Sequence, residues 1–209
     1  MFIVHFGSGS DTLDTHRRGV EKERLPLGTQ GLTEETFRTF VVFLCAVMVS
    51  MATDFTIREA ARSEVAIVLH HRWAMFRDMG QGTAEELDRM VKAAEPLLAL
   101  ALDDGSYRHW LAVEASGRVV GGGGVLLCPW PANPKDACTE RAMILNVYTE
   151  PEFRKLGVAR RIMQTILHWI RTRGLLSANL HASDEGRVLY EKLGFVATNE
   201  MRLRFDGEK

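Results

Sequence analysis

The chain contains 209 residues, which suit one domain with a sizeable hydrophobic core plus an appendage. Lys and Arg number 26 against 27 Asp and Glu, so the net charge is −1, and no basic stripe argues for nucleic acid or an anionic membrane surface as a partner. The cysteines (Cys45, Cys128, Cys138) form no C-x-x-C pair, which indicates a reducing, cytoplasmic setting rather than a disulfide framework or zinc site. Because His70 and His71 would face different ways on one helix, no metal site is expected.

Residues 1–50 differ in character from the rest of the chain. Residues 7–31 are polar and lack periodicity, which predicts disorder. The apolar run from Phe40 to Val49 is too short to span a bilayer as a helix and too far from the N-terminus for an ordinary signal peptide. We expect 1–50 to be an appendage or a misassigned start, and 51–209 to form the domain. A membrane or partner anchor at the apolar run is the alternative.

The domain opens with a strand and two helices. Phe55–Arg58 is predicted to be the strand, and Glu59–Met79 the first helix, because its apolar residues recur at helical spacing. The second helix is expected from Thr83 to Leu102, with Thr83 as its N-cap and acidic residues in its first turn. Pro96 is expected to kink or split this helix.

A β-hairpin follows the two helices. Its strands are His109–Val113 and Val119–Cys128, joined around Ser116 and Gly117. The four successive glycines 121–124 predict a strand with little side chain, where backbone and ligand could come close. A polar, proline-rich loop covers residues 129–139.

A compact turn follows the next strand, an apolar run that begins at Ile144 and ends at Pro151. The turn reads Arg-x-x-Gly-x-Ala over residues 154–159, and the helix after it has an apolar stripe at every fourth position from Val158 to Ile170. The free N–H groups and positive dipole end of that helix form an anion site, to which Arg154, Lys155 and Arg160 would add charge. Gly157 would let the backbone approach a ligand. The turn is therefore interpreted as a phosphate cradle for a cofactor.

A second strand and helix complete the pattern. The strand is Leu176–His181, and the helix covers residues 183–193, with Gly194 just past its end. A last strand is predicted from Phe195 to Arg204.

The two segments resemble the signature segments of the GNAT superfamily of acetyl-CoA-dependent N-acetyltransferases, over about residues 54–204. The resemblance implies an α/β fold with a mixed, twisted α+β sheet, in the order β-α-α-β-β-β-α-β-α-β. It also implies that acetyl-CoA is the co-substrate and that its pyrophosphate binds the turn, which comprises Arg154, Lys155, Leu156, Gly157, Val158, Ala159 and Arg160. The remaining implied cofactor contacts are the strand residues Val147, Tyr148 and Thr149, which would pair with pantetheine and face the thioester, and Ser183.

Tyr190 is the candidate general acid, since the family has a tyrosine here beside the coenzyme sulfur. A phenol stays protonated at neutral pH and can protonate a departing thiolate, although a space-filling core tyrosine is the alternative. The family often has Asn at the position of Ser183 and Ala at that of Gly186, and Ser183 could instead be an N-cap. Because Met143 stands where some members have a glutamate base, no dedicated base is expected.

The acceptor wall is expected at the end of the first helix. In the family this region borders the acceptor groove, which here would involve Trp73, Arg77 and Asp78 before the glycine-flanked Gln81. The alternative is an ordinary helix end, with the arginine complementing the dipole and Trp73 in the core.

The predicted function is direct transfer of an acetyl group from acetyl-CoA to a primary amine of a small molecule or peptide through a ternary complex. Neither signature segment contains a cysteine, which argues against an acetyl-enzyme intermediate. A non-catalytic acyl-CoA sensor is the alternative. No nucleic-acid or membrane partner is expected, and a homodimer is possible.

Overall fold

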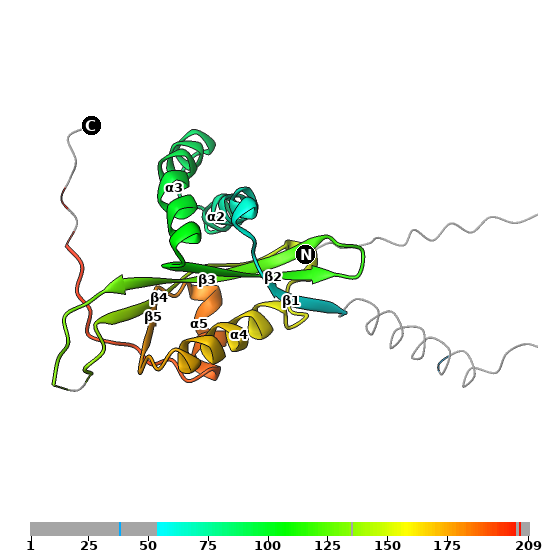
Figure 1. Ribbon diagram of the computed structural model, residues 1–209. Coiled ribbons are helices and arrows are strands. Elements are labelled where there is room, and N and C mark those ends of the chain that lie inside the picture. Colours follow the sequence, from blue (N-terminus) through cyan, green and yellow to red (C-terminus); the bar gives the residue numbers. More distant parts are fainter. Residues whose placement is uncertain (1–37, 39–53, 135, 204, 206–209) are drawn as a thin grey trace, which may run out of the picture. The chain divides into compact units, whose positions relative to one another are not determined.

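The computed structural model describes residues 38, 54–134, 136–203 and 205, and among them one sheet of five strands (Figure 1). The strands lie in chain order across the sheet, and all neighbours are antiparallel except β4 and β5, which are parallel. The predicted mixed α/β class is therefore confirmed. The strands are β1 (Phe55–Glu59), β2 (Tyr107–Glu114), β3 (Val119–Pro129), β4 (Glu140–Thr149) and β5 (Ala178–Leu180).

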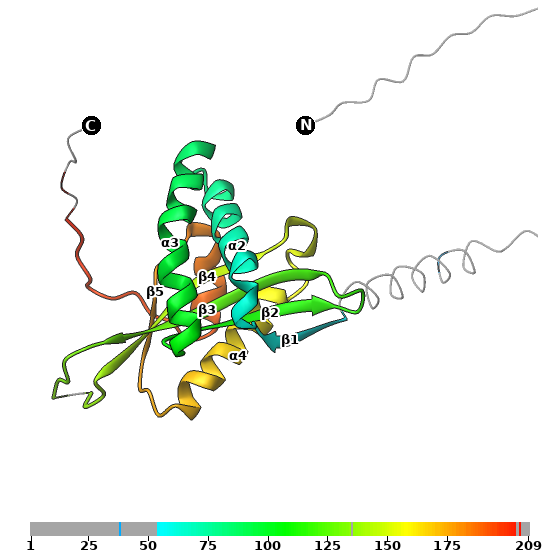
Figure 2. The same ribbon diagram turned by 45° about the horizontal axis from the view of Figure 1, so that its top comes forward.

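Helices cover both faces of the sheet. The helices α2 (Val65–Asp78) and α3 (Ala84–Asp104) lie side by side on one face, and α4 (Val158–Thr172) and α5 (Asp184–Lys192) lie on the other (Figures 1 and 2). The short 3₁₀ turns η1 (Arg62–Glu64) and η2 (Pro151–Phe153) precede α2 and α4. The predicted apolar stripe of α4 is buried against the sheet, and its four members are Val158, Ile162, Ile166 and Ile170.

The first predicted helix starts later than expected. Glu59 is the last residue of β1, and Ala60 donates its N–H to His109 O at 2.8 Å, so tertiary pairing holds the chain extended there. The second helix confirms its predicted cap, because Thr83 and Glu86 form a reciprocal capping box. Pro96 does not split α3, which continues as one helix to Asp104.

Side chains rather than a ligand occupy the space beside the glycine run of β3. A Cβ on Gly122 would lie 2.5 Å from His109 Nε2 and 2.9 Å from His71 Nδ1, and one on Gly124 would lie 2.4 Å from the Tyr107 hydroxyl. On the other face of the sheet, a Cβ on Gly123 would lie 2.9 Å from Ile162. The expectation of a ligand at the glycines was wrong, because side chains of α2, β2 and α4 fill the space beside Gly122, Gly123 and Gly124.

Gly124→Ala should lower the free energy of unfolding by about 1–3 kcal/mol, the usual cost of overpacking a core. The added methyl group would collide with the ring and hydroxyl of Tyr107, which is 1% exposed and has no space into which to move. Denaturant unfolding checks this, with Thr56→Ala at an exposed position of β1 as the control, expected to change stability by about 0.5 kcal/mol or less. Equal stability of the two variants would contradict the packing around Gly124.

The last predicted strand is absent from the described part of the chain. Residues 195–203 and 205 form no strand, and the side chains of Val196, Met201, Leu203 and Phe205 are exposed. The strand prediction was wrong. Alternating apolar residues form a strand only where they can pair with the edge of a sheet, and β5 at this edge is only three residues long. The expectations for residues 1–50 lie outside the described residues, apart from Arg38. Within the described residues, no helix combines the length and hydropathy needed to cross a bilayer.

Candidate active site

Strands β4 and β5 separate after a short stretch of pairing. β5 pairs only from Ala178 to Leu180, and the last pair joins Leu180 to Ile144. β4 continues to Thr149, so on the side of β5 its last residues have no strand partner in the described part of the chain. A cleft of about 930 Å³ opens at this separation, bounded by α2, β4, β5, α5 and the turn before α4. An exposed sheet edge of this kind can pair with the amide groups of an extended ligand.

A β-bulge interrupts β4 inside the cleft. Gly122 pairs with Tyr148 and Gly124 with Leu145, so Asn146 and Val147 together oppose Gly123. Asn146 has φ +55° and is buried, an uncommon conformation that the surrounding contacts must hold in place. The bulge changes the direction of the strand immediately before Val147, Tyr148 and Thr149. All three line the cleft, and their role in binding pantetheine stays a prediction.

The turn before α4 presents unpaired backbone donors. Lys155 and Gly157 have φ values of +62° and +86°, and the first intrahelical hydrogen bond runs from Arg161 N to Gly157 O at 3.0 Å. No acceptor in the described part of the chain pairs with the backbone N–H groups of residues 155–157, and those of residues 158–160 precede the first helical bond. Gly157 and Arg160 are exposed, whereas the Val158 side chain is core. Six successive donors at a helix N-terminus suit a phosphate group.

Arg154 of this turn contacts a predicted acceptor residue, Asp78. Its guanidinium pairs with the Asp78 carboxylate, and its Nε donates to Thr149 O at 3.1 Å. Burial opposes ionisation of Asp78, but hydrogen bonds from Arg77 and Arg154 lower its pKa below the ordinary value, so it is a carboxylate at neutral pH. The structure thus brings together the end of α2 and the predicted cofactor turn, which the sequence separates by 76 residues.

The other two predicted acceptor residues lie at the outer side of α2. Trp73 donates its indole N–H to Asp88 on α3 at 2.9 Å, and the Arg77 guanidinium lies 5.2 Å from the centre of the Trp73 ring. Asp78 lines the cleft, whereas neither Trp73 nor Arg77 is among its lining residues. Trp73 belongs to neither hydrophobic cluster and Arg77 pairs with Asp78, so the alternative with Trp73 in the core is not supported, and the acceptor role of both residues stays a prediction.

Tyr190 lies on α5 and faces the cleft from the side opposite α2. Its ring meets the Phe195 ring edge-on, with centroids 6.0 Å apart, and no described residue hydrogen-bonds to its hydroxyl. Burial raises the pKa of Tyr190 above its ordinary value, so the phenol keeps its proton at neutral pH. A Cβ on Gly186 would lie 2.8 Å from the Tyr190 ring, which explains why a glycine occupies that position.

Ser183 has the N-cap role that the sequence left open. Its Oγ accepts a hydrogen bond from Gly186 N at 3.1 Å at the start of α5, and the residue also lines the cleft. The hydroxyl proton is left available for a ligand, so a cofactor contact of Ser183 stays a prediction.

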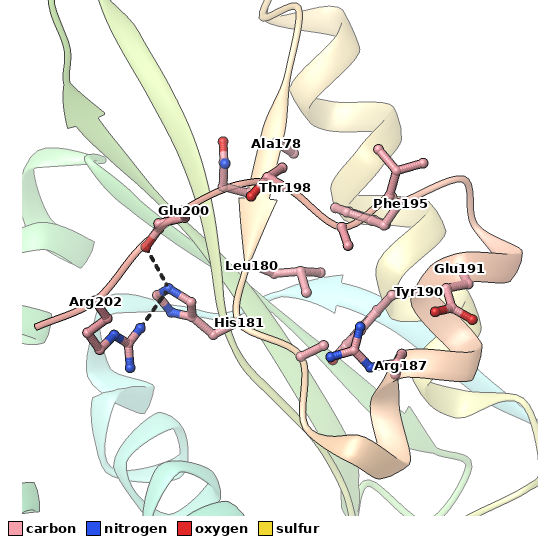
Figure 3. Close-up of a pocket in the computed structure, with 14 residues that line it drawn as sticks. Ala178, Leu180, His181, Arg187, Tyr190, Glu191, Phe195, Thr198, Glu200 and Arg202 are labelled. Atoms are coloured by element: carbon pink, nitrogen blue, oxygen red, sulfur yellow. Dashed lines mark hydrogen bonds and ion pairs between the residues drawn. The ribbon is translucent and has the colours of Figure 1, made fainter.

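A smaller cavity of about 540 Å³ adjoins the cleft between β5, α5 and the C-terminal segment (Figure 3). Tyr190, Arg187 and Phe195 border one end of it, and His181, Glu200 and Arg202 lie at the other. Tyr190, His181 and Arg202 line both hollows; the C-terminal segment forms one wall of the smaller cavity and contributes Arg202 to the cleft.

A buried polar network on the α2 side of the sheet was not predicted. Arg72 donates to Asn146 Oδ1 at 2.9 Å, Asn146 Nδ2 donates to the Tyr107 hydroxyl at 3.0 Å, and that hydroxyl lies 2.9 Å from His109 Nδ1. His71 lies beside this group, its ring 6.4 Å from that of His109. In the sequence, the adjacent pair His70 and His71 was the only sign of this network on α2. The residues that Arg72 and His71 meet lie on β2 and β4, so sequence spacing could not reveal the network.

The buried histidines make stability depend on pH. Burial lowers the pKa of His71 from 6.5 to about 4 and that of His109 from 6.5 to about 3, and each is further lowered by another histidine. Below pH 6.5 the unfolded state therefore binds more protons than the folded state, so stability is full above pH 6.5 and falls as the pH drops.

The free energy of unfolding should decrease by up to about 1.4 kcal/mol per pH unit for each buried histidine between pH 6.5 and about pH 5. Denaturant unfolding at a series of pH values measures this slope. His71→Gln should reduce the slope by about half, since one of two similar groups is removed, whereas His168→Gln at an exposed position of α4 should leave it unchanged. A wild-type stability independent of pH over this range would contradict the burial of neutral imidazoles.

Comparison with known proteins places these features in one family. The sequence profile of the acetyltransferase (GNAT) family matches residues 68–195. A GCN5-related N-acetyltransferase from Ralstonia eutropha JMP134 is 32% identical, with 74% of this chain and 100% of that chain covered and a TM-score of 0.69. A predicted acetyltransferase from Clostridium acetobutylicum, crystallised with acetyl-CoA, is 22% identical, with coverages of 73% and 96% and a TM-score of 0.66, and it supports the fold alone.

A curated relative is similar over a shorter stretch. The glucosamine 6-phosphate N-acetyltransferase of Trypanosoma brucei brucei is 28% identical over 95 residues, which are 44% of this chain. The matched region spans 60% of that relative's length. The family profile, by contrast, covers more than half of this chain and includes α2, the open edge of β4, the turn before α4, and α5. The chain therefore belongs to the acetyltransferase (GNAT) family.

Proposed function

We propose that this protein transfers an acetyl group from acetyl-CoA directly to a primary amine of a small molecule or peptide, in a ternary complex. One observation carries the proposal: the unpaired edge of β4, the donor-rich turn before α4 and the protonated Tyr190 all border one cleft. A held thioester needs an anion site, amide partners and a proton donor for the departing sulfur, and the cleft supplies all three.

The turn would hold the pyrophosphate of acetyl-CoA. The backbone N–H groups of residues 155–160 have no backbone acceptor in the described part of the chain, and Lys155 and Arg160 add positive charge. Gly157 leaves the space over the helix end open, since a Cβ there would meet no atom within 4 Å.

The open edge of β4 would hold the pantetheine arm and the thioester. The backbone groups of Val147 and Tyr148 that face away from β3 can pair with amides, and one N–H aimed at the thioester carbonyl would stabilise the developing negative oxygen. A single preorganised donor of this kind is worth about 3–4 kcal/mol of transition-state stabilisation.

Tyr190 would protonate the departing thiolate. The amine nitrogen forms a bond to the acetyl carbon, the carbon–sulfur bond breaks, and the phenol proton passes to sulfur, while the amine gives up a proton to water. Of the two described cysteines, neither Cys128 nor Cys138 lines the cleft, which favours direct transfer over an acetyl-cysteine intermediate. The carboxylate of Asp78 is occupied by two arginines, so the proposal assigns no side chain as the base.

A panel of amines assayed for CoA release tests the proposal, together with calorimetry of acetyl-CoA binding. The panel should include amino sugars, their phosphates, amino acids, polyamines and peptides, and the acetylated product should be identified by mass. We expect turnover of at least one amine with intersecting double-reciprocal plots, the sign of a ternary complex. Tight acetyl-CoA binding without turnover of any amine would contradict the enzyme and support the acyl-CoA sensor.

The setting of the enzyme is also proposed. The cysteine pattern supports a cytoplasmic location, and a homodimer is one possible oligomeric state. Sedimentation of the purified protein would measure its oligomeric state.

A further inference from the structure

Arg72 is a cation that lines the cleft and has no carboxylate partner among the described residues. It lies on α2, is only partly exposed, and packs its guanidinium 5.0 Å from the centre of the Phe76 ring. Its side-chain contact is the hydrogen bond to the neutral amide of Asn146, and its buried Nε atom has no acceptor among the described residues. Arg154, which also lines the cleft, is by contrast paired with the Asp78 carboxylate.

In the part of the chain that the structure describes, no carboxylate forms an ion pair with Arg72. Burial lowers the pKa of its guanidinium, which shows that its positive charge has lost hydration, yet arginine remains charged at neutral pH. The adjacent phenol of Tyr107 stays neutral because burial raises its pKa. A half-buried cation with an unused donor is costly to a protein unless an anion completes the site.

The network behind Arg72 holds its partner in one orientation. The Asn146 amide donates to the Tyr107 hydroxyl, so its oxygen is the atom turned toward Arg72. The hydroxyl is itself held by His109, and all three of these partners are buried. This arrangement fixes the guanidinium before any ligand arrives, which reduces the entropy cost of binding.

The position of Arg72 identifies the ligand as part of the acceptor. Asn146 directly precedes Val147 on the bulge, so Arg72 is anchored one residue from the edge proposed to hold the thioester. The neighbouring lining residues on α2 and just after it, Met75, Phe76 and Met79, are apolar and would cover the carbon skeleton of a small molecule. Phosphates of the cofactor are accounted for at the turn before α4.

We infer that Arg72 binds an anionic group of the acceptor, a carboxylate or a phosphate, and thereby selects small amines that carry an acid group near the reacting nitrogen. This inference rests on the proposed acetyl transfer. A planar guanidinium can bind either anion through its terminal N–H groups, and Arg72 Nη2 has no hydrogen-bond partner among the described residues. The half-buried position makes such bonds stronger than they would be on the surface.

Matched pairs of amines test the inference by differing only in the acid group. Glucosamine 6-phosphate against glucosamine tests phosphate, and β-alanine against its carboxamide tests carboxylate. We expect kcat/KM to be higher for the acidic member of at least one pair, and the pair that shows the preference identifies the anion. Arg72→Gln should lower kcat/KM for that acidic member by about 10- to 100-fold and for its neutral partner by less than about 3-fold.

Two further variants separate anion binding from structural support. Arg89→Gln removes the same charge from an exposed position of α3, where the arginine pairs with Glu85. This variant should leave kcat/KM unchanged for both the acidic and the neutral amine. Arg72→Lys keeps the charge, so its kcat/KM for the acidic amine should lie between those of Arg72→Gln and the wild type. If the melting curve shows that Arg72→Gln is unfolded, Arg72→Lys takes its place in the comparison with the wild type. Calorimetry of acetyl-CoA should give wild-type affinity for each folded variant.

The possible results separate the anion site at Arg72 from the proposed acetyl transfer. Turnover of acidic and neutral amines with equal kcat/KM, or an equal loss for both in Arg72→Gln, would overturn the anion site and leave acetyl transfer standing. Absence of CoA release with every amine, despite acetyl-CoA binding, would overturn the acetyl transfer and with it the inference.

Discussion

Replacing Gly157 with glutamate should abolish measurable acetyl-CoA binding, with affinity reduced by at least about 100-fold. Gly157 lies at the start of α4 with φ +86°, and the space next to it is open. A glutamate there would place a carboxylate over the unpaired N–H groups that are proposed to bind the pyrophosphate. The added charge would repel the phosphates and compete for their donors. Isothermal titration calorimetry with acetyl-CoA measures the loss.

Gly157→Ala is the matched control for backbone strain. Both side chains face the same cost of about 1–2 kcal/mol for a left-handed conformation, so both variants should lose similar free energy of unfolding. Only glutamate adds charge, and only it should eliminate binding. Wild-type affinity of Gly157→Glu would contradict the phosphate site, whereas equal loss of binding in both variants would assign the effect to the altered turn.

Replacing Tyr190 with phenylalanine should lower kcat by about 100-fold or more and leave acetyl-CoA affinity nearly unchanged. The ring packing against Phe195 and over Gly186 is retained in the variant, and the hydroxyl, which has no described partner, is the only group lost. Without the general acid the thiolate departs more slowly. The variant therefore has a lower kcat but an unchanged affinity for acetyl-CoA.

Steady-state kinetics and calorimetry on the same preparation check this prediction, and thermal unfolding supplies the control. The variant should melt within a few degrees of the wild type, because removing an unpaired hydroxyl leaves the core packing intact. Turnover at the wild-type rate would assign Tyr190 to the core alone. A fall in kcat accompanied by lost acetyl-CoA binding would instead indicate that the phenol positions the cofactor.

The sequence alone predicted those features of the helices and turns that depend on residues only a few positions apart. The Thr83 cap with Glu86, the Ser183 cap of α5 and the apolar stripe of α4 were all readable, because capping and helix amphipathicity depend on spacings of three or four residues. The Arg-x-x-Gly-x-Ala turn was readable for the same reason. Its left-handed glycine and the helix that follows it are neighbours in the chain.

The tertiary structure alone decided where the strands separate and which side chains meet at that place. β5 ends after three residues, so the edge of β4 stays open and the expected last strand has no partner edge of useful length. The space beside the β3 glycines is filled by residues from α2, β2 and α4, and the contact between Asp78 and Arg154 joins distant segments. These features depend on packing between layers, and no single stretch of sequence contains the information that would predict such packing.

Arg72 illustrates this difference most clearly. By itself it is one arginine in an amphipathic helix, a position at which a solvated charge is the ordinary expectation. Its significance arises from Asn146, on a bulge 74 residues away, and from Tyr107 behind it, which together turn it toward the cleft. The sequence by itself determined the family and predicted the turn that is proposed to hold the cofactor, because both are short-range patterns. The proposed acceptor side became visible only in the tertiary structure, because it is assembled from three elements that are brought together when the sheet and α2 pack.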